Sequence, residues 1–188
     1  MKPSLVLIFS LVLLFFGSQR CEAQCENKAN PKFANFPARL YDGKVHDPIL
    51  STNHQRMFRT RIQEAAKDGV NFAGHYVVAS WGCGTGCTQF VVLDAITGAV
   101  AEPPFESVDF HYWLFLAKIP KWANYEPKWS CYDDFLTSHA DSSLLVVEGC
   151  IRNQQCGRTF YEMKDGRLRQ VFFDPDLLPD GTVALIGP

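Results

Sequence analysis

The spacing of apolar residues in the first half of the chain predicts one α-helix. In residues 51–69 apolar side chains recur at intervals of three and four, which is the period of an amphipathic helix. They form one face: Phe58, Ile62, Ala65 and Ala66. Three adjacent residues can cap its start: Ser51, Thr52 and Asn53. Gly69 suits the left-handed position after its end. We therefore expect a helix over about 53–68 that lies on a sheet.

After this helix the apolar pattern changes to the period of two that is typical of β-strands. Five segments rich in β-branched and aromatic residues are predicted strands: 75–81, 88–94, 143–149, 158–164 and 167–173. Asp165-Gly166 separates the last two, and it favours a two-residue hairpin turn because both central positions need a positive φ. Gly98 serves a similar turn in residues 94–100.

Two stretches of the chain share one order of parts. HYVVASWGCGTGCTQFVVLDAITGAV begins at residue 75, and SLLVVEGCIRNQQCGRTFYEMKDGRL begins at residue 143. Each contains a strand, Gly-Cys, a short polar loop, a second Cys, a second strand, a turn and a third strand. We predict an α+β fold that is mainly an antiparallel sheet or open barrel. Its parts are two three-stranded meanders with disulfide-stapled tips and the single helix.

The remaining segments have no sustained period. Residues 24–50 are rich in Pro and Asn and are predicted to form an extended arm. Residues 105–142 form an aromatic-rich insert that prolines interrupt repeatedly. Such an insert is either a packed cover over the sheet or a functional loop. As a loop it would present rings that stack on sugars or grip a peptide. The candidate ligand-binding residues are aromatic: Trp81, Trp122, Tyr125 and Trp129.

The N-terminus has the features of a secretory signal peptide. Lys2 precedes the uncharged run LVLIFSLVLLFF, which is shorter than the roughly 20 apolar residues that span a bilayer. Small residues at Cys21 and Ala23 predict cleavage after residue 23. Residues 24–188 then form a single exported globular domain, periplasmic or secreted, with no transmembrane segment. Arg20 fits a lipoprotein signal poorly, which favours soluble export over a lipid anchor at Cys21.

Cleavage at this point changes the cysteine count and the charge. Of the seven cysteines, six remain: Cys25, Cys83, Cys87, Cys131, Cys150 and Cys156. An even number in an exported chain indicates disulfides. Cys83–Cys87, Cys150–Cys156 and Cys25–Cys131 are the predicted pairs, and pairing between the two tips is the alternative. Loss of Lys2, Arg20 and Glu22 reduces 18 basic and 20 acidic side chains to 16 and 19. This balance gives no reason to expect nucleic acid as a partner.

Cysteine chemistry and metal binding are both disfavoured by this context. A redox thiolate needs a helix N-terminus or a nearby cation, whereas WGCGTGC runs into a strand. A four-cysteine zinc site needs reduced thiols, which an exported chain does not keep. No metal or other cofactor is therefore predicted.

One acid–base pair is a catalytic candidate. If the two similar stretches are equivalent, Trp81 corresponds to Glu148. His75 shares a strand face with Trp81, so His75 and Glu148 could meet near one end of the sheet. The simpler interpretation is a half-buried histidine bonded to the backbone.

The segment FRTRIQEAAKDGVNFAGHYVVASWGCGTGCTQFVVLDAITGAV resembles a family of small exported bacterial proteins of unknown function. That family is marked by a helix followed by NFAGHY and WGCGTGC. The resemblance covers Phe58 to about Pro104 and extends loosely to the C-terminal unit, and it implies the compartment and the fold but no activity. We expect an exported binding module for a protein, peptide or cell-wall glycan of the cell envelope. The alternative is a hydrolase-type enzyme that uses His75 with a carboxylate such as Glu148.

Overall fold

The structure is a computed structural model that describes residues 29–109, 135–151 and 156–175. The chain divides into two compact units, Met1–Asn30 and Pro31–Pro188, and the second contains the sheet. The predicted signal peptide lies outside the described residues. Within the described part, no helix has the length and apolar character needed to cross a membrane.

The predicted helix forms at the expected place but is broken in the middle. Two helices, α3 (Asn53–Met57) and α4 (Arg59–Asp68), meet at Phe58, whose φ of −101° and ψ of 18° interrupt the regular backbone. Thr52 is the N-cap of α3 in a capping box with Gln55. Gly69 follows α4 with φ of 94°, so it takes the positive φ that its type permits.

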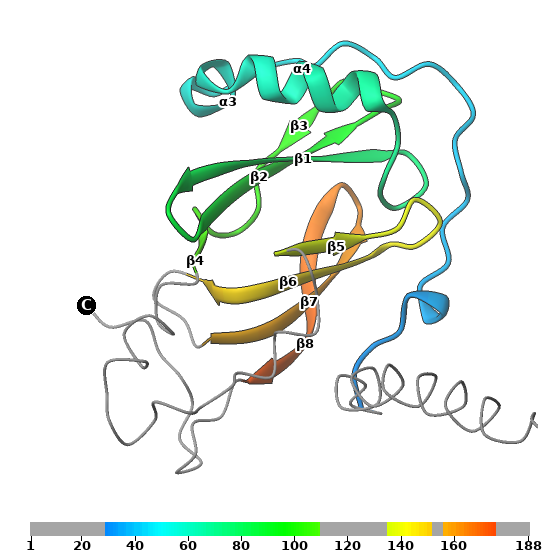
Figure 1. Cartoon of the computed structure of the whole chain (residues 1–188). Helices are drawn as coiled ribbons and strands as arrows, with labels where there is room; N and C mark the ends of the chain where they lie inside the picture. Colours follow the sequence, from blue (N-terminus) through cyan, green and yellow to red (C-terminus); the bar gives the residue numbers. More distant parts are fainter. Residues whose placement is uncertain (1–28, 110–134, 152–155, 176–188) are drawn as a thin grey trace, which may run out of the picture. The chain divides into compact units, whose positions relative to one another are not determined.

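One eight-stranded antiparallel sheet forms the body of the unit (Figure 1). Its strands are β1 (Tyr76–Gly84), β2 (Cys87–Asp94), β3 (Val100–Ala101), β4 (Val108–Asp109), β5 (Leu136–Ser138), β6 (Leu144–Ile151), β7 (Cys156–Lys164) and β8 (Arg167–Pro175). The strand order is β1-β2-β4-β6-β7-β8, with β3 paired to β2 and β5 paired to β6. The two predicted meanders are β1-β2-β3 and β6-β7-β8, and β4 joins them. The α+β, sheet-dominated fold is thus confirmed.

The hairpin turns have the backbone conformations that the sequence predicts. Asp165 and Gly166 have φ of 52° and 71°, as a two-residue hairpin between β7 and β8 requires. Gly98 has φ of 76° in the turn between β2 and β3. β3 is only two residues long, since Pro103 and Pro104 follow shortly after it and cannot donate to a ladder.

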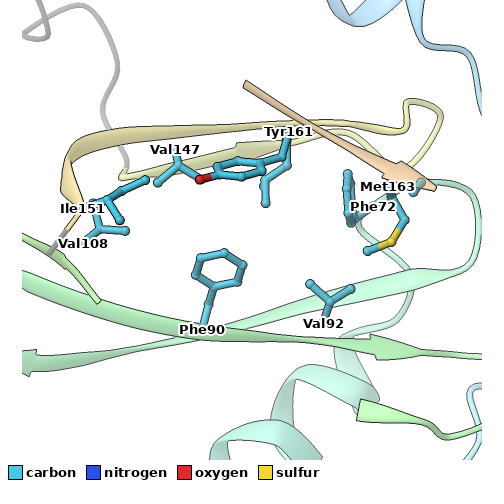
Figure 2. Close-up of a cluster of buried hydrophobic side chains, with 10 residues drawn as sticks. Phe72, Phe90, Val92, Val108, Val147, Ile151, Tyr161 and Met163 are labelled. Carbon is cyan, nitrogen blue, oxygen red and sulfur yellow. The ribbon is translucent and has the colours of Figure 1, made fainter. Parts of the chain in front are cut away.

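The main core lies between the two meanders. Figure 2 shows Phe90 and Val92 of β2 on one side and Val147 of β6 with Tyr161 and Met163 of β7 on the other, with their side chains in the space between. A second cluster packs Ile62 of α4 against β1 and β2, so the β1-β2 half is covered on both faces. Burying one large apolar side chain contributes about 1.5–3 kcal/mol, so these clusters hold the layers together.

The described part of the predicted N-terminal arm, up to residue 50, contains a short 3-10 helix, η1 (Phe33–Asn35). Phe33 and Phe36 pack against the outer face of β6 and β7, where Leu144, Val146 and Phe160 form a third cluster. Farther along, the backbone of the arm bonds to Gly74, Ala95 and Gly98 in turn. The arm therefore fastens both meanders.

Two glycines make this close passage possible. Gly74 has φ of 82°, and a Cβ there would collide with the carbonyl oxygen of Arg39. Gly98 has φ of 76°, and a Cβ would lie 2.5 Å from the carbonyl oxygen of Asp47. No L side chain fits such a position without strain. Glycine at these two positions therefore allows the arm to pass this close to the sheet.

The ends of the predicted aromatic insert belong to the sheet. Phe105 packs against Phe90 and Tyr161, with ring centroids 5.7 Å apart in each pair. β4 and β5 also lie within residues 105–142. Three candidate ligand-binding rings lie outside the described residues: Trp122, Tyr125 and Trp129.

Candidate functional site

The two cystine tips close the two long hairpins of the sheet. Cys83 bonds to Cys87 with a Cα–Cα distance of 5.1 Å, and Cys150 bonds to Cys156 at 4.0 Å. Both predicted local pairs are confirmed, and pairing between the tips is excluded. Asp109 of β4 pairs with Cys87 on one side and Cys150 on the other. The cystines therefore staple the sheet where its halves join. Cys25 and Cys131 lie outside the described residues.

His75 and Glu148 are not brought together. His75 lies in the turn before β1, where Gly74 bonds to Ala140 near the start of β6. Glu148 is the fifth residue of β6, about 13 Å beyond the first residue of that strand at 3.3 Å per residue. Strand alternation also turns Glu148 away from the main core, because Leu145 and Val147 face that core.

Glu148 belongs instead to a charged row on the outer face of the C-terminal meander. In the strand register Glu148 lies opposite Arg158, and Arg158 lies opposite Asp174. Glu148 and Arg158 are 3% and 4% exposed. The guanidinium of Arg158 lies 3.4 Å from the Asp174 carboxylate. Removing one partner of a buried ion pair such as Arg158–Asp174 is costly.

Trp81 is a packed residue whose ring contacts a helix. It is 7% exposed, and its ring stacks on Phe58 with centroids 4.4 Å apart. Its indole Nε1–H donates to Oε1 of Gln89 on β2 at 3.1 Å. His54 of α3 contacts the same indole, with ring centroids 5.8 Å apart. Trp81 thus lies behind Gln89 and His54 and supports their positions.

Those two side chains open onto a cleft of about 500 Å³, which we call the acidic cleft. Its lining comes from α3, β2 and the segment after β3: His54, Gln89, Phe90, Glu102, Pro103, Pro104, Phe105 and Glu106. The polar groups are an imidazole, an amide and two carboxylates, and the walls are proline and phenylalanine. A concave site with a few convergent polar groups is typical of ligand binding.

Glu102 is the best-positioned charge in the acidic cleft. Its Oε1 accepts a hydrogen bond from the Thr52 hydroxyl at 2.7 Å and lies 3.7 Å from Nδ1 of His54. Thr52 is also the N-cap of α3. The same hydroxyl therefore caps the helix and holds the Glu102 carboxylate in place. The carboxylate is held in place while 39% of its side chain remains exposed.

Gln55 connects this helix start to the sheet. It is 2% exposed. Its Oε1 accepts from the Ser51 backbone N–H at 2.7 Å, and its Nε2 donates to the Val100 carbonyl at 3.2 Å. Because Val100 lies on β3 just before Glu102, this link sets α3 and Glu102 at a fixed separation.

Burial also raises the pKa values of two tyrosines of the sheet. Burial raises the pKa of Tyr161 to about 12. Burial, and to a lesser degree the negative charge of Asp94, raises the pKa of Tyr76. In both residues burial favours the neutral phenol over the phenolate.

The acidic cleft brings an imidazole, an amide and two carboxylates together in one concave site. Its described lining contains no Ser, Thr or Cys that could act as a nucleophile. Across the described residues, no group of three or more His, Cys, Asp and Glu could hold a metal ion. The pair of His54 and Glu102 was not predicted, since the two residues are far apart in sequence and neither falls in a motif.

Comparison with known proteins leaves the site to be interpreted on its own geometry. No family model, no curated protein and no solved structure matches this chain.

Proposed function

We propose that the protein is an exported binding module whose acidic cleft receives a basic side chain of a peptide or protein partner. The observation that carries the proposal is the lining of the cleft, in which two carboxylates, an imidazole and an amide lie beside apolar walls. Export is supported by the N-terminal signal pattern and by the two disulfides, which persist in oxidising compartments.

A basic side chain matches both parts of this lining. Lysine and arginine carry an aliphatic stem that packs on apolar surface and a cationic head that remains polar. Pro103, Pro104 and Phe105 offer the apolar surface, and Glu102 and Glu106 supply the negative charge. A cation near the ring of Phe105 would gain about 0.5–1 kcal/mol more.

The two other candidate functions have less support. Among the described residues, the glycan function loses one of its candidate rings, because Trp81 is packed against Phe58. The hydrolase alternative relied on His75 and Glu148, which lie at different ends and faces of the sheet.

Isothermal titration of the mature domain with the peptide Ac-Gly-Arg-Gly-Lys-Gly-NH₂ tests the proposal. We expect binding that weakens with added salt, because exposed charges are screened. Glu102→Gln should weaken it at least tenfold, since a charge-assisted hydrogen bond contributes about 1.5–3 kcal/mol. Glu64→Gln is the matched control, because Glu64 carries the same charge on the exposed side of α4, paired with Arg61.

Two results would contradict the proposal. One is equal binding by the Glu102 and Glu64 variants. The other is salt-independent binding of a neutral chitooligosaccharide with no binding of the basic peptide, which would favour the glycan function.

A further inference from the structure

The edge of β1 that does not pair with β2 is a second feature of interest, separate from the acidic cleft. Backbone groups of alternate strand residues point to opposite sides. The carbonyl of His75 accepts from Ala95 next to β2, so residues 77, 79 and 81 also bond to β2. The N–H and C=O groups of Tyr76, Val78, Ser80 and Gly82 therefore point away from β2.

The first half of this edge is already paired within the chain. Tyr76 exchanges backbone hydrogen bonds with Phe72, at 2.8 and 3.0 Å. Val78 is paired by a side chain: its N–H donates to Oδ1 of Asn71 at 2.7 Å, and its C=O accepts from Nδ2 at 3.2 Å. The amide of Asn71 thus occupies the place of a neighbouring strand.

The second half has no such partner among the residues that the structure describes. Ser80 and Gly82 are exposed, and no residue that the structure describes bonds to their outward groups. A pocket of about 260 Å³ adjoins them: Ser80, Trp81, Gly82, Thr88, Phe135 and Leu136. Phe135 and Leu136 pack against the main core, which gives this pocket an apolar side.

We propose that this edge binds an extended polypeptide segment of a partner protein as an added β-strand. Donors and acceptors at strand spacing are matched by another extended backbone, which is the basis of strand addition. A partner residue opposite Gly82 would direct its side chain to the same face as Thr88, towards the pocket. Gly82 has no side chain of its own there, so an apolar side chain of the partner has room.

A proline at the edge provides the sharpest variant. Ser80→Pro removes the outward N–H and places a ring where the added strand would lie, but it breaks no hydrogen bond within the described chain. Ser80→Ala changes the side chain and keeps the backbone donor, so it is the matched control. A circular dichroism melt of each variant verifies that the fold is kept.

The first experiment is amide hydrogen exchange by NMR on the free mature domain. The amides of Ser80 and Gly82 should exchange at least tenfold faster than that of Val78, which Asn71 protects. Equal protection at all three would mean that the edge is already filled by the chain itself or by a second copy, and this would overturn the proposal.

The second experiment is selection from a phage-displayed library of random linear dodecapeptides. We expect enriched sequences that bind the wild type and Ser80→Ala, lose at least tenfold in affinity on Ser80→Pro, and protect the amides of residues 80 and 82. No enrichment, or enriched peptides that bind Ser80→Pro equally, would overturn the proposal. Glu102→Gln should leave this binding unchanged, which separates the edge from the acidic cleft.

Discussion

Replacing Gln55 tests how the acidic cleft is assembled. Gln55→Ala removes the side chain that accepts from Ser51 and donates to Val100 while being 2% exposed. Loss of the capping interaction costs about 1 kcal/mol, and loss of the buried bond to Val100 costs about 1–2 kcal/mol. We expect the free energy of unfolding to fall by about 2–3 kcal/mol, the sum of these two costs. The melting temperature should then fall by about 4–12 °C.

The assay is urea denaturation of the mature domain, followed by far-UV circular dichroism and tryptophan fluorescence, with coincident transitions taken as two-state. Gln63→Ala is the matched control, because Gln63 is exposed on α4 and its loss should change stability by less than about 0.5 kcal/mol. Equal stability of the two variants would refute the inferred link between α3 and β3.

The variant Gln55→Glu distinguishes the contribution of the hydrogen bond to Ser51 from that of the hydrogen bond to Val100. It keeps an oxygen for Ser51 but turns a carboxylate towards the Val100 carbonyl. We expect a loss of stability at neutral pH that is partly recovered in acid, where the protonated carboxyl can donate.

Three further predictions concern the sheet. Tyr161 has its pKa raised to about 12 against an ordinary 10.0. The neutral phenol thus contributes stability that is complete below pH 10 and is lost as the pH rises towards 12, about 2–3 kcal/mol in all. In Tyr161→Phe that part of the alkaline loss should be missing from pH-dependent melts, and an unchanged profile would contradict the assignment. Gly74→Ala should cost about 2–4 kcal/mol from backbone strain and the collision with the N-terminal arm. Gly69→Ala, where a Cβ meets nothing within 4 Å, should cost about 1 kcal/mol, and equal costs in urea unfolding would argue against the tight passage of the arm. Arg158→Ala should cost about 3–5 kcal/mol because it removes the buried cation of the ion pair with Asp174. Arg169→Ala, in an exposed pair, should cost less than about 1 kcal/mol, and a similar value for Arg158 would contradict a buried ion pair.

The elements of this fold were predictable because each rests on local chemistry. The helix and the five long strands follow from periods of 3.6 and 2. The two cystines follow from short spacing and flanking glycines. The break at Phe58 was not predictable, because its ring stacks on Trp81, which is far away in sequence.

The candidate sites depended on tertiary arrangement. Trp81 and Glu148 do occupy corresponding places in the two meanders. The meanders pack face to face across the main core, however, so corresponding outer positions point in opposite directions. The acidic cleft joins His54, Gln89 and Glu102 from three separate segments. The Asn71 amide acts as a strand partner only because the chain folds back at Phe72.

The most direct test of the central claim is an NMR titration of the ¹⁵N-labelled mature domain with Ac-Gly-Arg-Gly-Lys-Gly-NH₂. The indole N–H of Trp81 is a natural reporter, because it donates to Gln89 in the wall of the acidic cleft. We predict saturable shifts of this signal and of the signals of His54 and Glu102, and their loss in Glu102→Gln. Shifts confined to other parts of the sheet, or unchanged shifts in Glu102→Gln, would contradict the claim.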